Sequence, residues 1–168
     1  MSSQRQLVVM HRLEVARFLH ESRTAAVSTL NRDGSIHSIA MWYGFIGETI
    51  AISTRVHSQK ARNIARNPNT TMLIESGCLD YDHLKGVQIV GTADPVQTDQ
   101  ERMELGRSLF SRYVESGSEP PESLVATMVE NRLLLKVRPT RVVSWDHSKL
   151  PPRGQLPDTA RRLRLAAD

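Results

Sequence analysis

The stretch STRVHSQKARNIARNP, residues 53–68, passes from the end of a β-strand pattern into a short helix pattern. Its basic residues gather where the helix is expected to begin, at Arg55, His57, Lys60 and Arg62. A helix N-terminus carries partial positive charge and unpaired N–H groups, so acidic side chains are favoured there and basic ones are not. No Asp or Glu occurs from Thr49 to Ile74. The stretch is therefore expected to meet negative charge that this part of the chain does not supply.

The residue types around this junction are those of a phosphate site. Five side chains are expected to converge there: Ser53 and Thr54 at the strand end, Ser58 and Gln59 at the helix start, and Lys60 in the first turn. Hydroxyls, an amide, free backbone N–H groups and a cation together bind phosphate at helix N-termini. A solvated basic helix face is the alternative interpretation. The absence of a carboxylate over 26 residues favours the phosphate site.

The sequence before this junction predicts a helix and an antiparallel meander. Residues 11–22 carry apolar residues at helical spacing, namely Leu13, Ala16, Phe18 and Leu19. Three strands are predicted next, over residues 24–30, 36–45 and 49–55, joined by an Asp-Gly turn and by a turn at Gly47. In the helix at the junction, Ser58 is the predicted N-cap and Asn67-Pro68 the end. Its predicted buried stripe is Ala61, Ile64 and Ala65.

The rest of the chain adds strands and two further helices. Strands are predicted over residues 69–76 and 85–97, and Thr98 with Glu101 forms a T-x-x-E capping box. The helix that follows is expected to bury one face, Leu105, Leu109, Phe110 and Tyr113. A short helix over residues 122–131 and two strands, 132–140 and 141–150, complete the pattern. Strands linked mostly by turns predict a mainly β fold, a closed or nearly closed antiparallel barrel with peripheral helices.

Composition and charge narrow the class of protein. The 168 residues are 39% hydrophobic and 24% charged, which is typical of one globular domain, placed at residues 1–147. The net charge of +4 comes mostly from residues 148–168, which we expect to be a basic, mobile tail. No apolar run is long enough to cross a bilayer, and the single cysteine, Cys78, excludes an internal disulfide. These features predict a cytoplasmic protein without a membrane partner.

Other kinds of site are disfavoured by what the sequence lacks. Its six histidines form no H-x-x-x-H or H-E-x-x-H pair, and it has no G-x-S-x-G elbow and no P-loop. We therefore predict no metal site and no hydrolytic triad. Aromatic residues make up only 5% of the chain, too few for the stacking surface of a barrel that binds single-stranded nucleic acid. A nucleic-acid partner is not expected.

The ordered pattern from Ser22 to Pro95, with a weaker echo at RPTRVVSWDH, resembles a known family. It is similar to the flavin and deazaflavin oxidoreductases with the pyridoxamine-phosphate-oxidase-like split β-barrel. The most specific piece is ST…SQKARNIARNP. The resemblance implies a split antiparallel β-barrel, a homodimer and two cofactor sites formed between the subunits.

The resemblance also implies roles for individual residues. One strand would lie along the cofactor ring and offer mainly backbone groups: Ser38, Ile39, Ala40, Met41 and Trp42. The cofactor phosphate would be held by Ser53, Thr54, Ser58, Gln59 and Lys60. Gly86 and Val87 would reach the same cofactor from the partner subunit. Trp145 matches a position where members place an aromatic near the ring, with a core tryptophan as the alternative.

The cofactor implied by the resemblance is the deazaflavin coenzyme F420, with FMN as the alternative. Arg55, Arg62 and Arg66 would give the acidic tail of F420 cationic partners. The segment VVSWDHSKLPP lacks the Arg-x-His pair of true pyridoxamine-phosphate oxidases, so vitamin B6 oxidation is not expected. The expected activity is hydride transfer to a small electron-poor molecule, without a catalytic acid or base from the protein. A carrier that binds flavin or haem without turnover is the other alternative.

Overall fold

The computed structural model describes residues 4–76, 81–114 and 119–151, so Cys78 and most of the predicted tail lie outside the described residues. The helices of the described residues are α1 (Gln4–Leu7), α2 (Arg12–Glu21), α3 (Gln59–Arg66), α4 (Asp99–Tyr113), α5 (Glu122–Val129) and the 3-10 helices η1 (Tyr81–His83) and η2 (His147–Lys149). Their strands are β1 (Thr24–Leu30), β2 (Ile36–Trp42), β3 (Gly44–Ile46), β4 (Thr49–Arg55), β5 (Asn69–Ser76), β6 (Lys85–Pro95) and β7 (Arg132–Asp146). The predicted boundary between body and tail at residues 147 and 148 stays a prediction.

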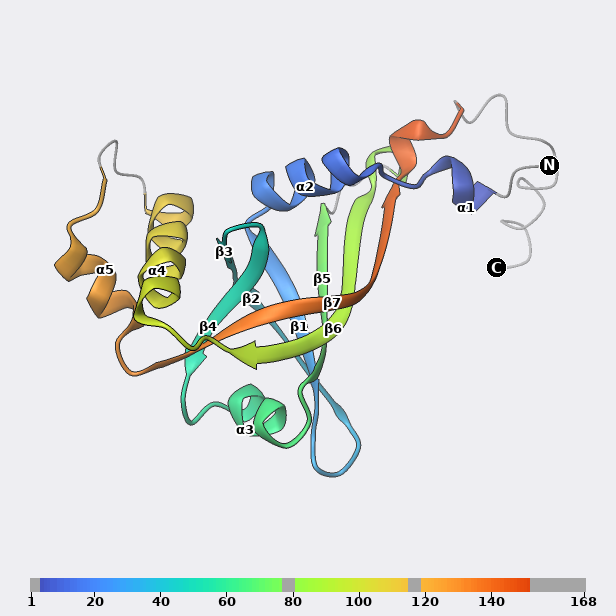
Figure 1. The fold of residues 1–168 in the computed structure, drawn as a ribbon. Coiled ribbons are helices and arrows are strands. Elements are labelled where there is room, and N and C mark those ends of the chain that lie inside the picture. The colour runs from blue at the N-terminus through green and yellow to red at the C-terminus, as the bar shows by residue number, and fades with distance from the viewer. Residues whose placement is uncertain (1–3, 77–80, 115–118, 152–168) are drawn as a thin grey trace.

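The strands form one antiparallel sheet in the order β2-β1-β5-β6-β7-β4-β3. The strands at the two ends of this order, β2 and β3, are consecutive in the chain and are separated only by Tyr43. The sheet therefore curls until its edges approach each other at this residue, as Figure 1 shows. This is the split antiparallel barrel expected from the sequence.

Two strand predictions are wrong in their boundaries. Residues 36–45 are not one strand, because the chain turns at Tyr43, so that β2 pairs with β1 and β3 pairs with β4. Residues 132–150 hold one long strand, β7, rather than two. The register of β6 against β7 shifts between Val90 and Gly91, which absorbs the irregularity at Pro139 as a bulge. A Cβ at Gly91 would lie 2.0 Å from the carbonyl oxygen of Arg138, so only glycine fits there.

The main core fills the barrel, and α2 lies across one end of it (Figure 1). Phe18 of α2 is buried and Leu19 packs beside it, as predicted, but Leu13 is 84% exposed and Ala16 is also exposed. The buried face of α2 therefore differs from the predicted one: Val15, Phe18 and Leu19 contact the barrel core, and Leu13 and Ala16 face solvent.

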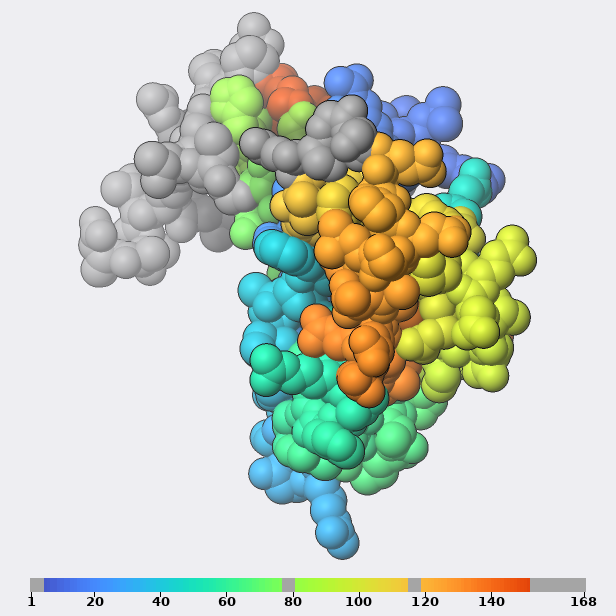
Figure 2. Space-filling model, turned by 90° about the vertical axis from the view of Figure 1, so that its left-hand side faces the viewer, coloured from blue at the N-terminus to red at the C-terminus, as the bar shows by residue number. Residues whose placement is uncertain are grey.

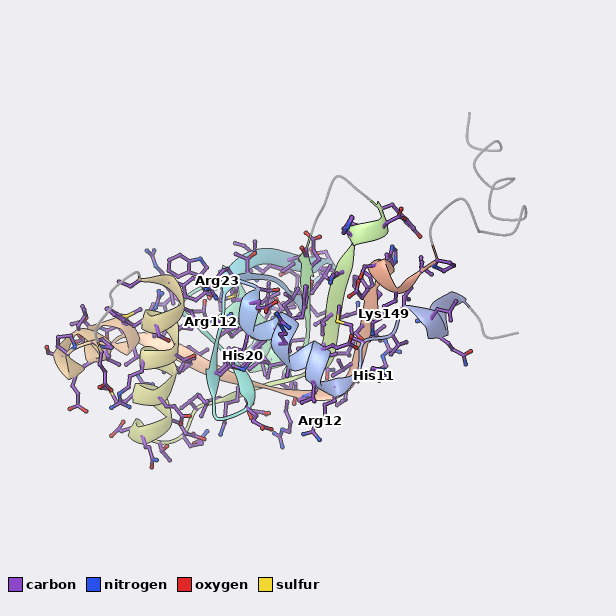
Figure 3. All side chains as sticks on the ribbon, turned by 90° about the horizontal axis from the view of Figure 1, so that it is seen from above. His11, Arg12, His20, Arg23, Arg112 and Lys149 are labelled. Carbon is purple, nitrogen blue, oxygen red and sulfur yellow. The ribbon has the colours of Figure 1, made fainter. Side chains whose placement is uncertain are left out.

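A cluster of hydrogen bonds fixes the end of α2. Tyr43 is fully buried, and its hydroxyl donates to the carbonyl of Leu19 at 2.6 Å. Burial raises the pKa of Tyr43 to about 12, so the phenol stays protonated at neutral pH. Arg112 reaches from α4 to the same place and donates to the carbonyls of Tyr43 (3.1 Å) and His20 (2.9 Å). Figure 3 labels Arg112, His20 and Arg23 at this corner. Strands, α2 and α4 are joined at this corner.

The helix α3 closes the opposite end of the barrel (Figure 1). Ala61 and Ile64 are buried as predicted, but Ala65 is exposed and Asn63 takes the third buried position. The side-chain amide of Asn63 donates to Thr29 Oγ1 at 3.0 Å and to Asn31 Oδ1 at 2.8 Å. A buried amide is tolerated here because its donors are paired.

The two helices between β6 and β7 pack on the outside of the sheet. The buried face of α4 contains Leu105, Leu109 and Phe110, as predicted, and Tyr113 packs at its edge. Thr98 caps this helix by accepting a hydrogen bond from Glu101 N at 3.2 Å, as predicted. The second bond of the predicted capping box is not formed, because the Glu101 carboxylate accepts from Gln97 N and pairs with Lys136 instead. The helix α5 lies beside α4, and Val125 and Val129 are its buried residues. Among the described residues, no helix combines the length and apolarity needed to cross a bilayer.

Candidate functional site

A cavity of about 650 Å³ opens where the end of β4, the start of α3 and the start of β7 meet the helices α4 and α5. Figure 2 shows this face of the molecule, with α5 and the start of β7 in its centre, β2 to the left and the end of β4 below. Side chains from β2, β4, α3, α4, α5 and β7 line the cavity. It has a polar side, built by β4, α3 and β7, and an apolar side, built by β2, α4 and α5.

The polar side contains an unsatisfied hydroxyl. The Oγ of Ser53 is buried and has no hydrogen-bond partner, the one such side-chain atom found in the described ranges. Next to it in sequence, Thr54 Oγ1 lies 3.0 Å from Ser58 Oγ and accepts a hydrogen bond from Lys60 Nζ at 3.1 Å. Ser58 also caps α3 by accepting from Ala61 N at 3.2 Å, which confirms it as the N-cap. A buried hydroxyl without a hydrogen-bond partner lowers stability, so a ligand that bonds to Ser53 Oγ would be favoured here.

Three cations face this cavity: Arg55, Lys60 and Arg132. Arg55 and Arg132 are directly opposite each other on β4 and β7, although like charges in this position destabilise a sheet. Within the described residues, the side chain of neither arginine forms a hydrogen bond or an ion pair. Burial, and then the charge of Arg132, hold the pKa of Lys60 below its ordinary value. The arrangement is unfavourable to the empty protein and favourable to a bound anion.

A residue in the left-handed backbone conformation places Arg132 beside Arg55 and Lys60. Asn131 has a φ of +52°, a conformation that asparagine adopts more easily than most residues. It turns the chain from the end of α5 directly into β7, so that the first residue of the strand lies opposite Arg55. Beside the main cavity, the same arginines line a second, more open groove that also contains His57 and Glu130.

The apolar side offers a flat aromatic surface. Trp42 is 55% exposed, and its ring stacks on Tyr113 with centroids 4.2 Å apart and an interplanar angle of 8°. Met41 of β2, Leu109 of α4 and Met128 of α5 complete this side of the cavity. The cavity therefore suits a molecule with an anionic group at one end and a flat apolar body at the other.

The structure brings together most of the side chains predicted for the phosphate. Ser53, Thr54, Ser58 and Lys60 line the cavity. The side chain of Gln59 instead donates to Asn31 Oδ1 at 3.3 Å and to Asn63 Oδ1 at 3.0 Å, away from the cavity lining.

The strand predicted to follow the cofactor ring is the edge strand β2. Met41 and Trp42 line the cavity, whereas Ser38, Ile39 and Ala40 lie farther along the strand and outside its lining. In the described part of the chain, β2 pairs with β1 alone, so its other edge keeps free backbone N–H and C=O groups. Free backbone groups on this strand agree with the role that the resemblance implies.

The remaining predicted residues lie elsewhere on the sheet. Gly86 and Trp145 are opposite each other on β6 and β7, and a Cβ at Gly86 would lie 2.1 Å from the Trp145 ring. The tryptophan thus packs flat on the glycine. Val87 is fully buried, and its strand is paired on both sides, with Ile74 of β5 and Ser144 of β7 opposite it, so this protomer exposes none of Val87 to a ligand. None of the three lines the cavity of this protomer.

Sequence reasoning missed four residues of the cavity: Leu109, Thr127, Met128 and Arg132. All four lie in or after the two helices between β6 and β7, more than 40 residues from the junction at Ser58 along the chain. Only the pairing of β4 with β7 brings Arg132 to Arg55. The sequence signal that could have pointed to Arg132 was a basic residue at the first position of a predicted strand. Its significance depends on the residue opposite it on β4, which is Arg55 rather than an acidic residue. In the described ranges, no three His, Cys, Asp or Glu side chains gather closely enough to hold a metal ion.

Comparisons with solved structures find the same fold in proteins that are described in different ways. A conserved hypothetical protein from Mycobacterium tuberculosis superposes with a TM-score of 0.82 and 34% identity, over 94% of this chain and 99% of that one. A structure described as an F420 reductase has a TM-score of 0.55 and 25% identity, over 75% and 93% of the two chains. The haem storage protein HutZ from Vibrio cholerae has a TM-score of 0.65, with 14% identity over 83% and 98%, which shows the fold alone.

A family model provides the assignment. No match was found among curated protein sequences. The model described as pyridoxamine 5'-phosphate oxidase matches residues 12–146, a range that contains the whole barrel and all of the cavity lining. The sequence, the curled antiparallel sheet and this match agree, and the chain belongs to the pyridoxamine 5'-phosphate oxidase family of split barrels.

Proposed function

We propose that the protein is a cytoplasmic oxidoreductase that binds a flavin-type cofactor through its phosphate in the polar side of the cavity. The observation that carries this proposal is the buried, unpartnered Oγ of Ser53 in a cavity that Lys60 also lines. A phosphate oxygen there would accept the hydrogen bond that Ser53 lacks, and Lys60 would offset its charge. The backbone of β2 and the side chain of Met41 would hold the ring.

The number of cations favours coenzyme F420 over FMN. FMN carries one phosphate, whereas F420 adds the carboxylates of its glutamyl tail to a phosphodiester. Arg55 and Arg132 remain without a partner after Lys60 is assigned to the phosphate, and they line the groove that leads outward from it. Arg62 and Arg66 are less suited to the tail, because they bond within the protein, Arg62 to the carbonyl of His57 and Arg66 to Asn63. The similarity to a structure described as an F420 reductase supports the same choice.

The bound cofactor would supply hydride transfer, and the protein would bind it, orient it and exclude water. No residue of the cavity stands out as an acid or base, since the groups that line it are hydroxyls, cations and apolar side chains. The substrate is then a small electron-poor molecule that needs no protein group to donate or accept a proton.

We also propose that the cofactor site is completed by a second copy of the chain. The edge strand β2 exposes Ile36 (65%) and Ile39 (44%), which is unusually apolar for a free sheet edge. A homodimer would cover this part of the strand and bring Gly86 and Trp145 of the partner toward the ring.

The direct test is a titration of the purified protein with F420 and, separately, with FMN, followed by absorption and fluorescence. Tighter binding of F420 than of FMN is expected, with reduction of quinone or enone probes when reduced cofactor is supplied. Tight binding without turnover of any probe would favour a non-catalytic carrier of flavin or haem. Failure to bind either cofactor would contradict the proposal.

A further inference from the structure

We propose that the exposed face of Trp42 is a preformed platform on which the substrate lies, and that the substrate is therefore a flat, uncharged, electron-poor ring. This inference rests on the proposed function, because it assigns the polar side of the cavity to the cofactor phosphate and the side chain of Trp42 to the second reactant. It concerns the side chain alone, whereas the role proposed above for β2 concerns its backbone.

The platform is held in place before any ligand arrives. One face of the Trp42 ring is covered by Tyr113, which lies parallel to it at 4.2 Å. The hydroxyl of Tyr113 accepts from Tyr43 N at 3.0 Å and lies within hydrogen-bond distance of the carbonyls of Tyr43 (2.9 Å) and Arg23. Tyr113 is thus anchored to the residue that follows Trp42 in the chain. A ring fixed in this way loses little conformational freedom when a ligand stacks on it.

The anchor itself belongs to the corner where α2, α4 and the strands meet. Figure 3 shows Arg112, Arg23 and His20 together at this corner. Arg112, the neighbour of Tyr113, donates hydrogen bonds to the carbonyls of Tyr43 and His20 and lies 4.8 Å from the centre of the Tyr43 ring. These bonds hold the C-terminal end of α4 against the barrel. Tyr113 therefore cannot move away from Trp42 without breaking them.

The surroundings of the exposed face set the chemistry of the ligand. Trp42 lines the cavity together with Met41, Leu109 and Met128, which offer no charge and no hydrogen-bond donor. The hydroxyl of Thr127, also in the lining, already donates to the carbonyl of Leu124 at 2.7 Å. The charged groups that line the cavity all come from β4, α3 and β7. An electron-rich indole stacks best on an electron-poor ring, so an uncharged quinone-like molecule fits this side.

The test uses menadione, a flat uncharged naphthoquinone, and a saturated, non-planar dione with the same ring skeleton. Equilibrium dialysis against the full chain gives the affinity of each. We expect menadione to bind more tightly than the saturated probe. Trp42→Leu is expected to weaken menadione about tenfold and to leave the saturated probe unchanged, since stacking on one aromatic ring contributes roughly this much. Equal affinities for the two probes, or no effect of Trp42→Leu, would overturn the platform.

Two further variants separate this inference from the proposed function. Leu13→Ala removes an exposed apolar side chain of α2 that does not line the cavity, and it is expected to leave menadione binding unchanged. Lys60→Ala is expected to weaken the cofactor but not menadione, so a failed cofactor site and a failed platform give different results. In protein loaded with oxidised cofactor, menadione should still bind. Competition between the two would assign the Trp42 face to the cofactor ring and contradict the substrate role. Near-ultraviolet circular dichroism checks that each variant is folded.

Discussion

The basic residues at the start of β7 and farther along it differ in whether they have an acidic partner. Arg132, at its start, lies opposite Arg55 and close to Lys60 and has no acidic partner in the described chain. Farther along the same strand, Lys136 pairs with Glu101 at 2.5 Å and Arg138 pairs with Asp94 at 2.6 Å. At the end of β7, Asp146 pairs with Lys85 of β6, and just after the strand Lys149 pairs with Glu14.

The difference indicates what each region is for. Paired cations are matched inside the fold and contribute modestly to its stability. The cations at the cavity are unmatched, and two of them oppose each other across the sheet, so they cost stability until an anion arrives. The partners that stabilise the barrel are encoded in the chain, whereas we propose that the partner of the Arg55, Lys60 and Arg132 cluster is an anion from solution.

Reversing a charge in the unmatched cluster is expected to have the largest effect. Lys60→Glu should weaken cofactor binding by about 100-fold or more, because it removes a charge-assisted hydrogen bond and places a carboxylate beside the phosphate. Fluorescence quenching of the cofactor measures the affinity. The matched control is Lys136→Glu, at the paired end of β7, for which an unchanged affinity is expected. Equal losses in the two variants would end the distinction between the regions.

Removing the opposed arginine should lower affinity and raise stability together. For Arg132→Gln we expect roughly tenfold weaker binding of F420. The free energy of unfolding should rise by up to about 1 kcal/mol, because the repulsion from Arg55 is relieved. Urea denaturation of the cofactor-free protein measures the second quantity. A loss of stability in this variant would mean that Arg132 has a structural role that the account does not include.

The pH dependence follows from the lowered pKa of Lys60. The charged ammonium is disfavoured in the empty fold, so this group lowers stability at neutral pH, and the penalty disappears as pH rises through its folded pKa toward the unfolded value. Cofactor affinity needs the charged form and should fall over the same range. Titrations from about pH 7 to about pH 10 should show opposite trends, spanning the ordinary titration range of a lysine. Lys60→Arg should flatten both curves.

The smallest effect is expected at the paired end. Lys136→Gln removes the ion pair with Glu101, which is partly exposed, so we expect only a small loss of stability. Because the pair with Lys136 is the main cause of the lowered pKa of Glu101, the loss should disappear as pH falls through that pKa. Thermal unfolding at two pH values checks this. An effect on cofactor affinity would contradict the assignment of Lys136 to the fold alone.

The sequence predicted the site where the signal was local. Ser58 as the cap of α3 and Lys60 in its first turn are set by a few neighbouring residues, and the structure places both as expected. Arg132 and Met128 were beyond reach, because they meet the junction only through the pairing of β4 with β7 and the packing of α5. They could not be predicted because they lie far from the junction along the chain, although their residue types suit the cavity.

The fold shows the same division. Its class followed from strand spacing and turns, but two boundaries did not. The sequence from Ile36 to Phe45 has the pattern of one continuous strand, although Tyr43 divides it. The division is seen only in the structure, where β2 pairs with β1 and β3 pairs with β4. The strand break predicted after Thr140 does not occur, because a bulge opposite Gly91 accommodates Pro139, which cannot donate a hydrogen bond, within one continuous strand. Asn63 occupies a buried position that helical spacing gave to an alanine, because Thr29 and Asn31 satisfy its amide.

The central claim, that a phosphate docks between Ser53 and Lys60, is tested most directly by comparing one cofactor with and without that phosphate. The dissociation constants of the deazaflavin core with and without a 5'-phosphate, or of FMN and riboflavin, are measured on the wild-type protein and on Lys60→Ala. The phosphate should improve affinity by about 100-fold in the wild type and by only about tenfold in the variant, a coupling expected of a charge-assisted hydrogen bond. An identical gain in both proteins would place the phosphate elsewhere and contradict the account.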